Sequence, residues 1–403
     1  MEPSSSDHTI DQDIDVIEAN DAVQIFGSHT DSVFCLAAAG SPNSGLIVSG
    51  GCDDIAFLWD VYSGVPLAKL TGFSDSVVDV AFSFDSSYVA AASYDSTVRI
   101  WKVDDLVSAA SSNSAIPEPT IISDFSEPVE KIQWHPKGNF LLSVSSDALF
   151  MHSVPNGRLV RTFTGSYLPS EGCWINEGKH VAAGFQNGDV SIFSPRDSSI
   201  VASCSSGKPE NRNSSGILTP ITCISASSST KLLSVGSEDG TISVFTLPQL
   251  KRVLCCSQHS DSIEGLAFLS NDQWLLSSST DGKLILLEIA SKQIRFELNF
   301  EESITGMSIR EYQGTNDAAY CTLSDGRIII VDTSRGTVID TIEGHSTTIN
   351  AHCFGPDNLL IAGADDGVVL VFSLDPLPQE EEEGKDDDEE EDIDVITEEI
   401  GNV

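Results

Sequence analysis

Short apolar strands alternate with polar turns from residue 22 to residue 374, and the pattern repeats in units. Each unit holds an apolar strand, a turn, a second apolar strand, an Asp-containing turn and a third strand. In the clearest unit these strands are 33–36, 46–49 and 55–59. The third strands end at equivalent positions that lie 41 to 52 residues apart: Trp59, Trp101, His152, Phe193, Phe245, Leu287, Val331 and Phe372. A period of this length with only strands and turns inside it is typical of β-propeller blades.

The number of strands predicts a ring that is closed by both ends of the chain. Seven units are followed by a fourth apolar segment, but the eighth runs into Pro376 and then glutamates. The N-terminal segment 22–26 and the residues after it align without gaps with 66–70 and the residues that follow. We therefore expect strand 22–26 to complete the eighth blade and to remove an open sheet edge. The predicted fold is all-β, a single eight-bladed propeller over 22–374, with a disordered acidic leader (1–21) and a disordered acidic tail (375–403).

Two insertions and a short repeat lie outside this pattern. The Ser- and Ala-rich segment 104–119 and the segment 205–220 both have the composition of loops. The pentapeptide Asp13–Ile17 recurs as Asp392–Ile396, either as a paired partner motif or as a coincidence in biased sequence. Outer strands begin, and third strands end, on the face of the ring opposite the loop 27–32. Both tails are therefore expected to leave the ring from that face.

The first unit carries a set of four side chains that is informative about the family. His29 lies in the loop between blades, Ser49 on the second strand, Asp53 in the turn and Trp59 on the third strand. This set resembles the WD40-repeat pattern, and the resemblance implies that the four form a hydrogen-bonded chain that fixes the blade. The other units are degenerate copies that lack one or more of the four. The resemblance supports the fold, but this fold serves many unrelated tasks.

Charge distinguishes this chain from an ordinary globular protein. Asp and Glu number 61 and Lys and Arg number 21, which gives a net charge of −40. Segments 1–21 and 380–399 hold about half of this excess, and the propeller holds the other half. Such a field repels nucleic acid and anionic membranes and attracts basic proteins. We therefore expect a basic protein partner and neither direct nucleic-acid binding nor membrane binding.

The acids divide into those the blades need and those they do not. Turn aspartates such as Asp53 and Asp95 are expected to bind their own loops. Ten other acids are expected to gather at one opening of the ring and bind the partner, the alternative being a solvated rim of charge. These predicted partner-binding residues are Asp31, Asp75, Glu127, Glu130, Glu238, Asp261, Glu264, Glu301, Glu302 and Asp365.

Nothing in the sequence supports catalysis, a cofactor or a metal site. The eight His are scattered, and the chain has no Ser-His-Asp order, no C-x-x-C pair and no phosphate-binding Gly loop. No apolar run approaches the roughly 18 residues that cross a bilayer. The nine cysteines form no recognisable disulfide framework, which favours a reducing compartment. We expect a non-enzymatic monomer in the cytoplasm and also in the nucleus.

A closer resemblance rests on blade one and blade three. The segments 29–34, 50–54 and 56–59, together with Trp134-His135-Pro136, resemble angio-associated migratory cell protein and the related WD40 chaperone of a large-subunit ribosomal protein of the L-ten (universal L-sixteen) type. The resemblance implies a chaperone that binds the basic N-terminal segment of that protein on an acidic face and escorts it to the pre-60S particle. A histone or other basic-protein chaperone and a WD40 signalling or assembly scaffold remain alternatives. Val61-Tyr62 after Trp59-Asp60 disfavours a ubiquitin-ligase adaptor, where the family places Arg.

Overall fold

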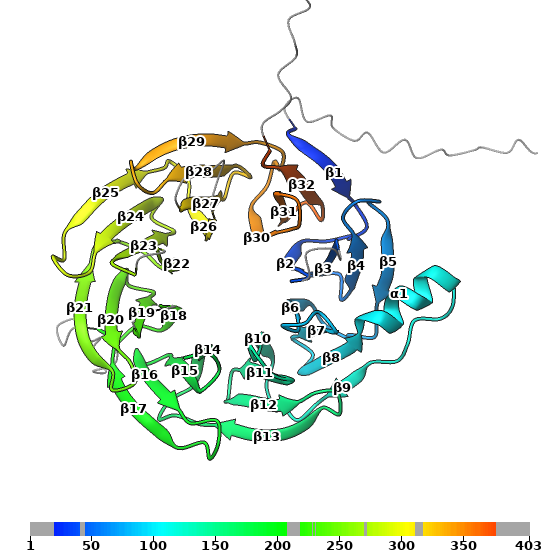
Figure 1. Ribbon diagram of the computed structural model, residues 1–403, viewed down its shortest axis with the longest axis horizontal. Coiled ribbons are helices and arrows are strands. Elements are labelled where there is room, and N and C mark those ends of the chain that lie inside the picture. Colours follow the sequence, from blue (N-terminus) through cyan, green and yellow to red (C-terminus); the bar gives the residue numbers. More distant parts are fainter. Residues whose placement is uncertain are drawn as a thin grey trace, which may run out of the picture.

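The chain folds into eight four-stranded antiparallel sheets that surround a common axis (Figure 1). The structure is a computed structural model that describes residues 20–40, 45–207, 218–227, 229, 231–269, 272–310 and 317–375. The predicted eight-bladed all-β propeller is confirmed. The tails, the paired pentapeptides and most of the predicted loop 205–220 lie outside the described residues.

Each of the first seven blades consists of four strands that follow one another in the chain. Blade 1 holds β2 (Val33–Ala38), β3 (Leu46–Gly51), β4 (Ala56–Asp60) and β5 (Pro66–Leu70). Blade 2 holds β6 (Val77–Phe82), β7 (Tyr88–Ser93), β8 (Thr97–Lys102) and β9 (Thr120–Ile122). Blade 3 holds β10 (Val129–Trp134), β11 (Phe140–Ser145), β12 (Leu149–Ser153) and β13 (Arg158–Phe163). Blade 4 holds β14 (Pro169–Ile175), β15 (His180–Phe185), β16 (Asp189–Phe193) and β17 (Ile200–Ser205).

The second half of the ring repeats this order. Blade 5 holds β18 (Ile221–Ala226), β19 (Leu232–Ser237), β20 (Thr241–Thr246) and β21 (Lys251–Ser257). Blade 6 holds β22 (Ile263–Phe268), β23 (Trp274–Ser279), β24 (Lys283–Glu288) and β25 (Ile294–Asn299). Blade 7 holds β26 (Ile304–Arg310), β27 (Ala318–Leu323), β28 (Ile328–Asp332) and β29 (Thr337–Ile342). Blade 8 holds β30 (Ile349–Phe354), β31 (Leu359–Ala364), β32 (Val369–Ser373) and the N-terminal strand β1 (Ala22–Phe26).

The N-terminal strand closes the ring, as the sequence predicts. β1 pairs antiparallel with β32, and Ala22 and Phe26 face Phe372 and Val369 across the ladder. Phe26 also stacks on Trp59 of blade 1, with ring centroids 4.9 Å apart. Both rings are buried. The first and last blades are therefore joined by hydrogen bonds and by a shared apolar cluster.

The core lies between neighbouring blades, where the repeated third-strand residues sit. All eight equivalent positions from Trp59 to Phe372 are buried. Each inner strand also carries a register irregularity after its first residue, for example between Val33 and Cys35 and between Ile304 and Gly306. A bulge bends a strand and increases its local twist. Its recurrence in every blade shows that one local geometry is built eight times.

Antiparallel pairing gives the ring two distinct faces. We call the face that carries the second-to-third strand turns and the connections between blades the top face, and the opposite one the bottom face. Asp375 lies on the bottom face, because it follows β32 and accepts a hydrogen bond from Asn358 Nδ2 at 2.9 Å. Asp21 instead forms two hydrogen bonds with Glu343, which begins a top-face connection. The expectation that both tails start from the bottom face is therefore correct for the C-terminal end and wrong for the N-terminal one.

The reason for this difference is the twist of each blade. Strands rotate progressively across a sheet, so the outer strands run nearly around the circumference (Figure 1). The start of β1 consequently lies beside the end of β29 at the outer rim. The N-terminal side of the chain thus reaches the propeller at its rim.

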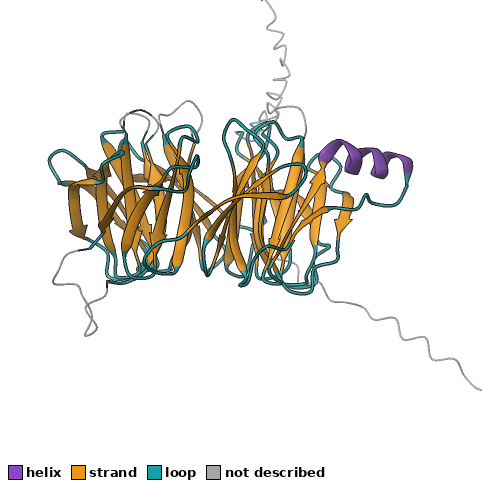
Figure 2. Cartoon of the chain, turned by 90° about the horizontal axis from the view of Figure 1, so that it is seen from below, coloured by secondary structure: helices purple, strands orange, loops and turns teal. Residues whose placement is uncertain are grey.

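The predicted loop 104–119 is wrong over most of its length. Residues Val103–Ser112 form α1, which lies outside the ring on one face (Figure 2). Val103, Leu106 and Ala109 are buried, and the first two join the core cluster of blades 1 and 2. Two aspartates in the first turn suit the positive end of the helix dipole, and Asn113 ends the helix in a left-handed conformation. The buried residues are spaced three apart, as in a helix, but the high Ser and Ala content of the segment made this pattern hard to recognise in the sequence.

Two further structural findings concern cysteines and membranes. None of the nine cysteines forms a disulfide bond. Among the described residues, no helix combines the length and apolar character that crossing a membrane requires.

Candidate binding face

A chain of hydrogen bonds fixes the top-face loop of blade 1 to its strands. His29 Nδ1 lies 3.0 Å from Asp53 Oδ1, and His29 Nε2 lies 2.8 Å from Ser49 Oγ. Trp59 Nε1 donates to the same Ser49 oxygen at 2.8 Å. Burial lowers the pKa of His29, although the hydrogen bond from the ring to Asp53 opposes that shift. The neutral ring can therefore donate to the carboxylate and accept from the hydroxyl at the same time.

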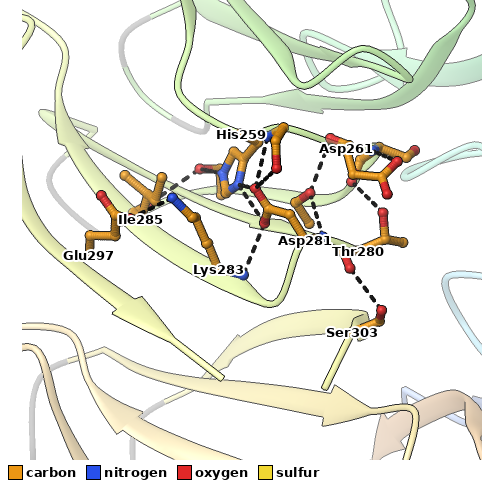
Figure 3. Close-up of polar contacts among 12 residues, drawn as sticks. His259, Asp261, Thr280, Asp281, Lys283, Ile285, Glu297 and Ser303 are labelled. Atoms are coloured by element: carbon orange, nitrogen blue, oxygen red, sulfur yellow. Dashed lines mark hydrogen bonds and ion pairs between the residues drawn. The ribbon is translucent and has the colours of Figure 1, made fainter. Parts of the chain in front are cut away.

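Blades 6 and 8 contain shortened versions of this chain. His259 lies 3.1 Å from Asp281 and 2.9 Å from Ser277, and Figure 3 shows its ring directed at the Asp281 carboxylate. Ser277 has no Trp partner, because Leu287 occupies that position. In blade 8 His345 pairs with Asp366 at 3.0 Å and reaches only a backbone oxygen beyond it. These interactions hold the top-face connections against the turns.

Blade 3 uses a different pair, which sequence reasoning missed. His152 occupies the third-strand position where blade 1 has Trp, and its Nε2 lies 3.2 Å from Asp124 Oδ2. Burial lowers the pKa of His152, with the Asp124 hydrogen bond opposing it. The available signal in the sequence was a polar residue, His152, at a third-strand position where other blades have an aromatic one. Only the fold shows that it replaces the loop histidine of blades 1, 6 and 8.

The turn aspartates bind their own loops, so they contribute less to a ligand site. Asp53 accepts from the Thr30 amide, Asp95 from the Ser74 amide and Asp281 from the Ser260 amide, all at about 3 Å. The glycine after Asp281 has a φ of 77°, and a Cβ there would lie 2.6 Å from Phe300 O. This close approach packs the turn against the next connection. These carboxylates are structural parts of the face.

The ten predicted partner-binding acids all lie on or beside the top face. Six lie in connections between blades, two lie in second-to-third strand turns, and two begin inner strands. Nine are exposed and Glu302 is half-buried. The connections hold Asp31, Asp75, Glu127, Asp261, Glu301 and Glu302. The turns hold Glu238 and Asp365, and the inner strands hold Glu130 and Glu264. They come from every blade except blade 4, counting each connection with the blade that follows it.

None of these ten carboxylates forms an ion pair with a Lys or Arg of the described chain. Six of them accept neutral hydrogen bonds, such as that from Ser146 to Glu130 at 2.7 Å and from Asn350 to Asp365 at 2.8 Å. Asp365 is thus held by a neighbouring side chain. Glu127, Glu238, Glu264 and Glu301 have no recorded side-chain partner among the described residues. Their charges remain available to a ligand.

The acids of neighbouring blades act on one another through space. Burial first, and then the carboxylates of Asp75, Asp53 and Asp95, raise the pKa of Asp54. Burial first, and then Glu130 and Asp75, raise the pKa of the Tyr94 hydroxyl. Charges from blades 1, 2 and 3 therefore share one negative field. Asp54, the second acid of the Asp53-Asp54 turn, was not among the predicted site residues.

Glu130 and Glu264 occupy a special position in the inner strands. The equivalent residues of blades 4, 5 and 7 are Ser170, Thr222 and Thr305, and each hydroxyl donates to a backbone oxygen of the next blade. An ionised glutamate has no proton to donate in this way. The two glutamates are accordingly exposed and stand at the start of the strands nearest the axis.

Exposed apolar side chains accompany the acids on one part of the top face. Tyr94, Tyr167 and Leu168 are 44%, 46% and 48% exposed, which is unusual for side chains of this size. Two other aromatic residues of blade 2, Phe73 and Trp101, are buried. Arg99 already lies over the Phe73 ring, 4.8 Å from its centroid. The aromatic surface that a ligand can reach is therefore Tyr94 and Tyr167.

Below the acidic opening, three charged residues of adjacent inner strands form a separate cluster. Lys131 Nζ lies 2.7 Å from Glu171 Oε1, and Asp79 Oδ2 accepts from the Ile132 amide at 2.7 Å. Burial raises the pKa of Asp79 to about 6, against the Ile132 amide and the charge of Lys131. This cluster joins blades 2, 3 and 4. In the described part of the chain, no group of three or more His, Cys, Asp or Glu is arranged to hold a metal ion.

Known proteins resemble this chain in sequence and fold. The model of the WD domain, G-beta repeat, matches residues 20–60, 64–102, 213–246, 250–286 and 336–373. Human angio-associated migratory cell protein is 26% identical over 371 residues, which cover 88% of this chain and 80% of the relative. The ribosome assembly protein SQT1 of Saccharomyces cerevisiae is 23% identical and covers 93% and 92% of the two chains.

Solved structures show the same architecture. The S. cerevisiae Sqt1 structure has a TM-score of 0.77 at 18% identity and covers 88% of this chain and 99% of its own. Chaetomium thermophilum Sqt1, bound to the N-terminus of the ribosomal protein L10, has a TM-score of 0.74 at 18% identity, covering 88% and 100%. At such identity the likeness concerns the fold.

Proposed function

We propose that this chain, a WD40-repeat β-propeller, is a ribosome-assembly chaperone. Its ligand is the basic N-terminal segment of a newly made large-subunit ribosomal protein of the L10 (universal L-sixteen) type, which it escorts to the pre-60S particle. The observation that carries the proposal is the set of ten top-face carboxylates from seven blades, none paired with a Lys or Arg of the described chain. The similarity to Sqt1, which binds such a segment, supports the choice of ligand.

The energetics favour an extended cationic ligand. One exposed ion pair contributes only about 0.2–1 kcal/mol, so micromolar affinity, near −8 kcal/mol, requires many contacts. A chain segment laid across the axis can reach acids of several blades at once. Ordering that segment costs free energy, and the exposed rings of Tyr94 and Tyr167 can offset part of it by stacking on Arg or Lys. Electrostatic attraction also accelerates encounter.

The cellular setting follows from this role. A chaperone of a newly made ribosomal protein acts in the cytoplasm and can accompany its cargo to the nucleus. One propeller offers one top face, so we propose that the chain acts as a monomer with one cargo segment.

The test reverses two charges that the fold does not use. In the full chain, Glu127→Lys with Glu264→Lys should weaken binding of the ribosomal N-terminal peptide at least tenfold, about 1.4 kcal/mol, measured by fluorescence anisotropy. The control variant is Asp104→Lys with Glu118→Lys, which changes the net charge equally, at an exposed residue in the first turn of α1 and an exposed residue after the helix. Equal affinity of the two variants would reject the assigned face.

Specificity separates this role from general handling of basic proteins. At matched salt, the ribosomal peptide should bind more tightly than core histone tails of equal charge. Raising the salt should weaken both, because exposed charges are screened beyond about 8 Å at physiological ionic strength. A preference for histones at every salt concentration would favour the histone-chaperone alternative.

A further inference from the structure

The bottom turns of blades 3, 4 and 5 are basic, in contrast to the rest of the molecule. Counted with the first residue of β13 and of β21, these turns are 135–139, 154–158, 176–179, 194–199, 227–231 and 247–251, of which residues 228 and 230 are not described. They contain six basic residues and two acids, Glu177 and Asp197. We call the basic residues the basic patch: Lys137, Arg158, Lys179, Arg196, Lys231 and Lys251. The chain has a net charge of −40, so this local excess of positive charge is exceptional. A surface of this kind attracts an anionic partner.

Two residues of the patch, Lys179 and Lys231, line a cavity of about 740 Å³ between blades 4 and 5. Lys179, His180, Lys231, Asn176 and Ser229 are among its lining residues. Lys179 and Lys231 are exposed, and neither ammonium group forms a hydrogen bond or an ion pair with a described residue, although Lys179 acts on the Glu177 carboxylate through space. The one acid of the lining, Glu177, is already paired with Lys137 at 2.9 Å. The cavity therefore presents positive charge that its own surroundings do not neutralise.

The chain itself supplies an acidic segment, which follows in sequence the described end of the chain on this face. Residues 380–399 hold fourteen acids and one lysine. The described chain reaches the bottom face at Leu374, whose amide donates to Asn358 O at 2.9 Å. Asp357, Asp375 and one basic residue, Arg310, lie around this exit, so these three side chains leave a net negative charge that does not favour the segment. The top face repels it as well, which leaves the basic patch as the complementary surface.

We propose that the acidic segment 380–399 docks on the basic patch of its own propeller, with carboxylates over Lys179 and Lys231. The length of chain is sufficient. Residues 390–399, which lie 15 to 24 positions after Asp375, can be at most about 50–85 Å from it, whereas a folded body of this size has a radius of gyration of about 20 Å. Blades 4 and 5 lie across the ring from blade 8 (Figure 1), on the order of 50 Å away for such a body.

Because the acidic segment is covalently attached to the propeller, a few weak ion pairs are sufficient to hold it on the basic patch. A tethered segment has an effective concentration in the millimolar range, so a few pairs of about 0.2–1 kcal/mol each keep it bound. Screening by salt should release it. Docking would cover the bottom face and leave the top face free. The inference is independent of what the top face binds.

Zero-length carbodiimide cross-linking of the full chain, read by mass spectrometry, tests the proposal. At low salt, acids of 380–399 should link to Lys179 and Lys231 at least fivefold more often than to Lys292, and 0.5 M NaCl should abolish this preference. Lys292 is the matched control because it is exposed on a bottom turn of blade 6, nearer to blade 8 around the ring. Tether length alone would favour Lys292.

A second variant and isotope labelling make the result decisive. Lys179→Glu with Lys231→Glu should also reduce links to Lys137 and Lys251 at least fivefold, whereas Lys292→Glu should leave those links unchanged. Mixing labelled and unlabelled protein distinguishes links within one chain from links between chains. Links spread evenly over exposed lysines, links only between chains, or undiminished links to Lys137 in the double variant would each overturn the proposal.

Discussion

The top and bottom turns of blades 3 to 5 differ sharply in charge although one repeat builds both. Among described residues, the top turns carry Asp124, Glu127, Asp147, Glu238 and Asp239 and no Lys or Arg. The bottom turns of the same blades carry six basic residues and two acids. Strand geometry does not require this difference, because both kinds of turn join antiparallel strands. The repeat thus fixes the positions of the loops, and loop composition gives each face its own ligand chemistry.

The largest expected effect is a difference in stability between two kinds of top-face variant. One kind removes an acid that holds the loops together, and the other removes an acid that forms no such contact. Asp53→Ala removes the partner of the buried His29 ring and of the Thr30 amide. We expect a loss of about 2–4 kcal/mol in the free energy of unfolding, measured by urea denaturation. Glu127→Ala should change stability by less than about 0.5 kcal/mol but weaken peptide binding. Equal destabilisation by both changes would remove the distinction.

A second prediction concerns the charged cluster that lies between the two faces. Burial raises the pKa of Asp79 to about 6, so folding favours its protonated form. Its stabilising contribution is present below the unfolded pKa of about 3.9 and is lost as the pH rises through about 6. Asp79→Asn should therefore stabilise the fold by about 1–3 kcal/mol at pH 7.5 and by almost nothing at pH 3.5.

Urea unfolding of wild type and Asp79→Asn across this pH range measures the effect. Asp332→Asn is a suitable control, because hydrogen bonds from Ser334 hold the pKa of Asp332 below its usual value. That variant should be less stable than wild type at neutral pH and approach it in acid. A constant difference between Asp79→Asn and wild type at every pH would contradict the raised pKa.

The smallest expected effect tests whether the two faces are independent. Deleting residues 380–403 removes fourteen acids, yet the described chain ends on the bottom face at Asp375, and charges beyond about 8 Å are screened. Affinity for a basic peptide at 0.15 M salt should change less than about threefold, or about 0.65 kcal/mol. Titration of full-length and shortened chains measures it. A hundredfold loss would show that the tail takes part in top-face binding.

The sequence alone was sufficient for the fold because the information is local and repeated. The third-strand residues from Trp59 to Phe372 recur at nearly constant spacing, and all eight are buried. The missing fourth strand of blade 8 and the matching segment 22–26 predicted the closure that β1 and β32 form. Likewise, acids that follow the turn aspartates or precede inner strands could be assigned to one face, because strand order alone decides on which face a loop lies.

Tertiary structure decided the features that depend on contacts between blades. The pairing of His152 with Asp124, the shared field around Asp54 and the Asp79 cluster join residues 28 to 53 positions apart or from different blades. α1 formed in a Ser- and Ala-rich segment because blades 1 and 2 bury Val103 and Leu106. The basic patch required three blades side by side, since each contributes only two basic residues. Repetition in the sequence specifies each blade, whereas charge and burial at any point depend on its neighbours.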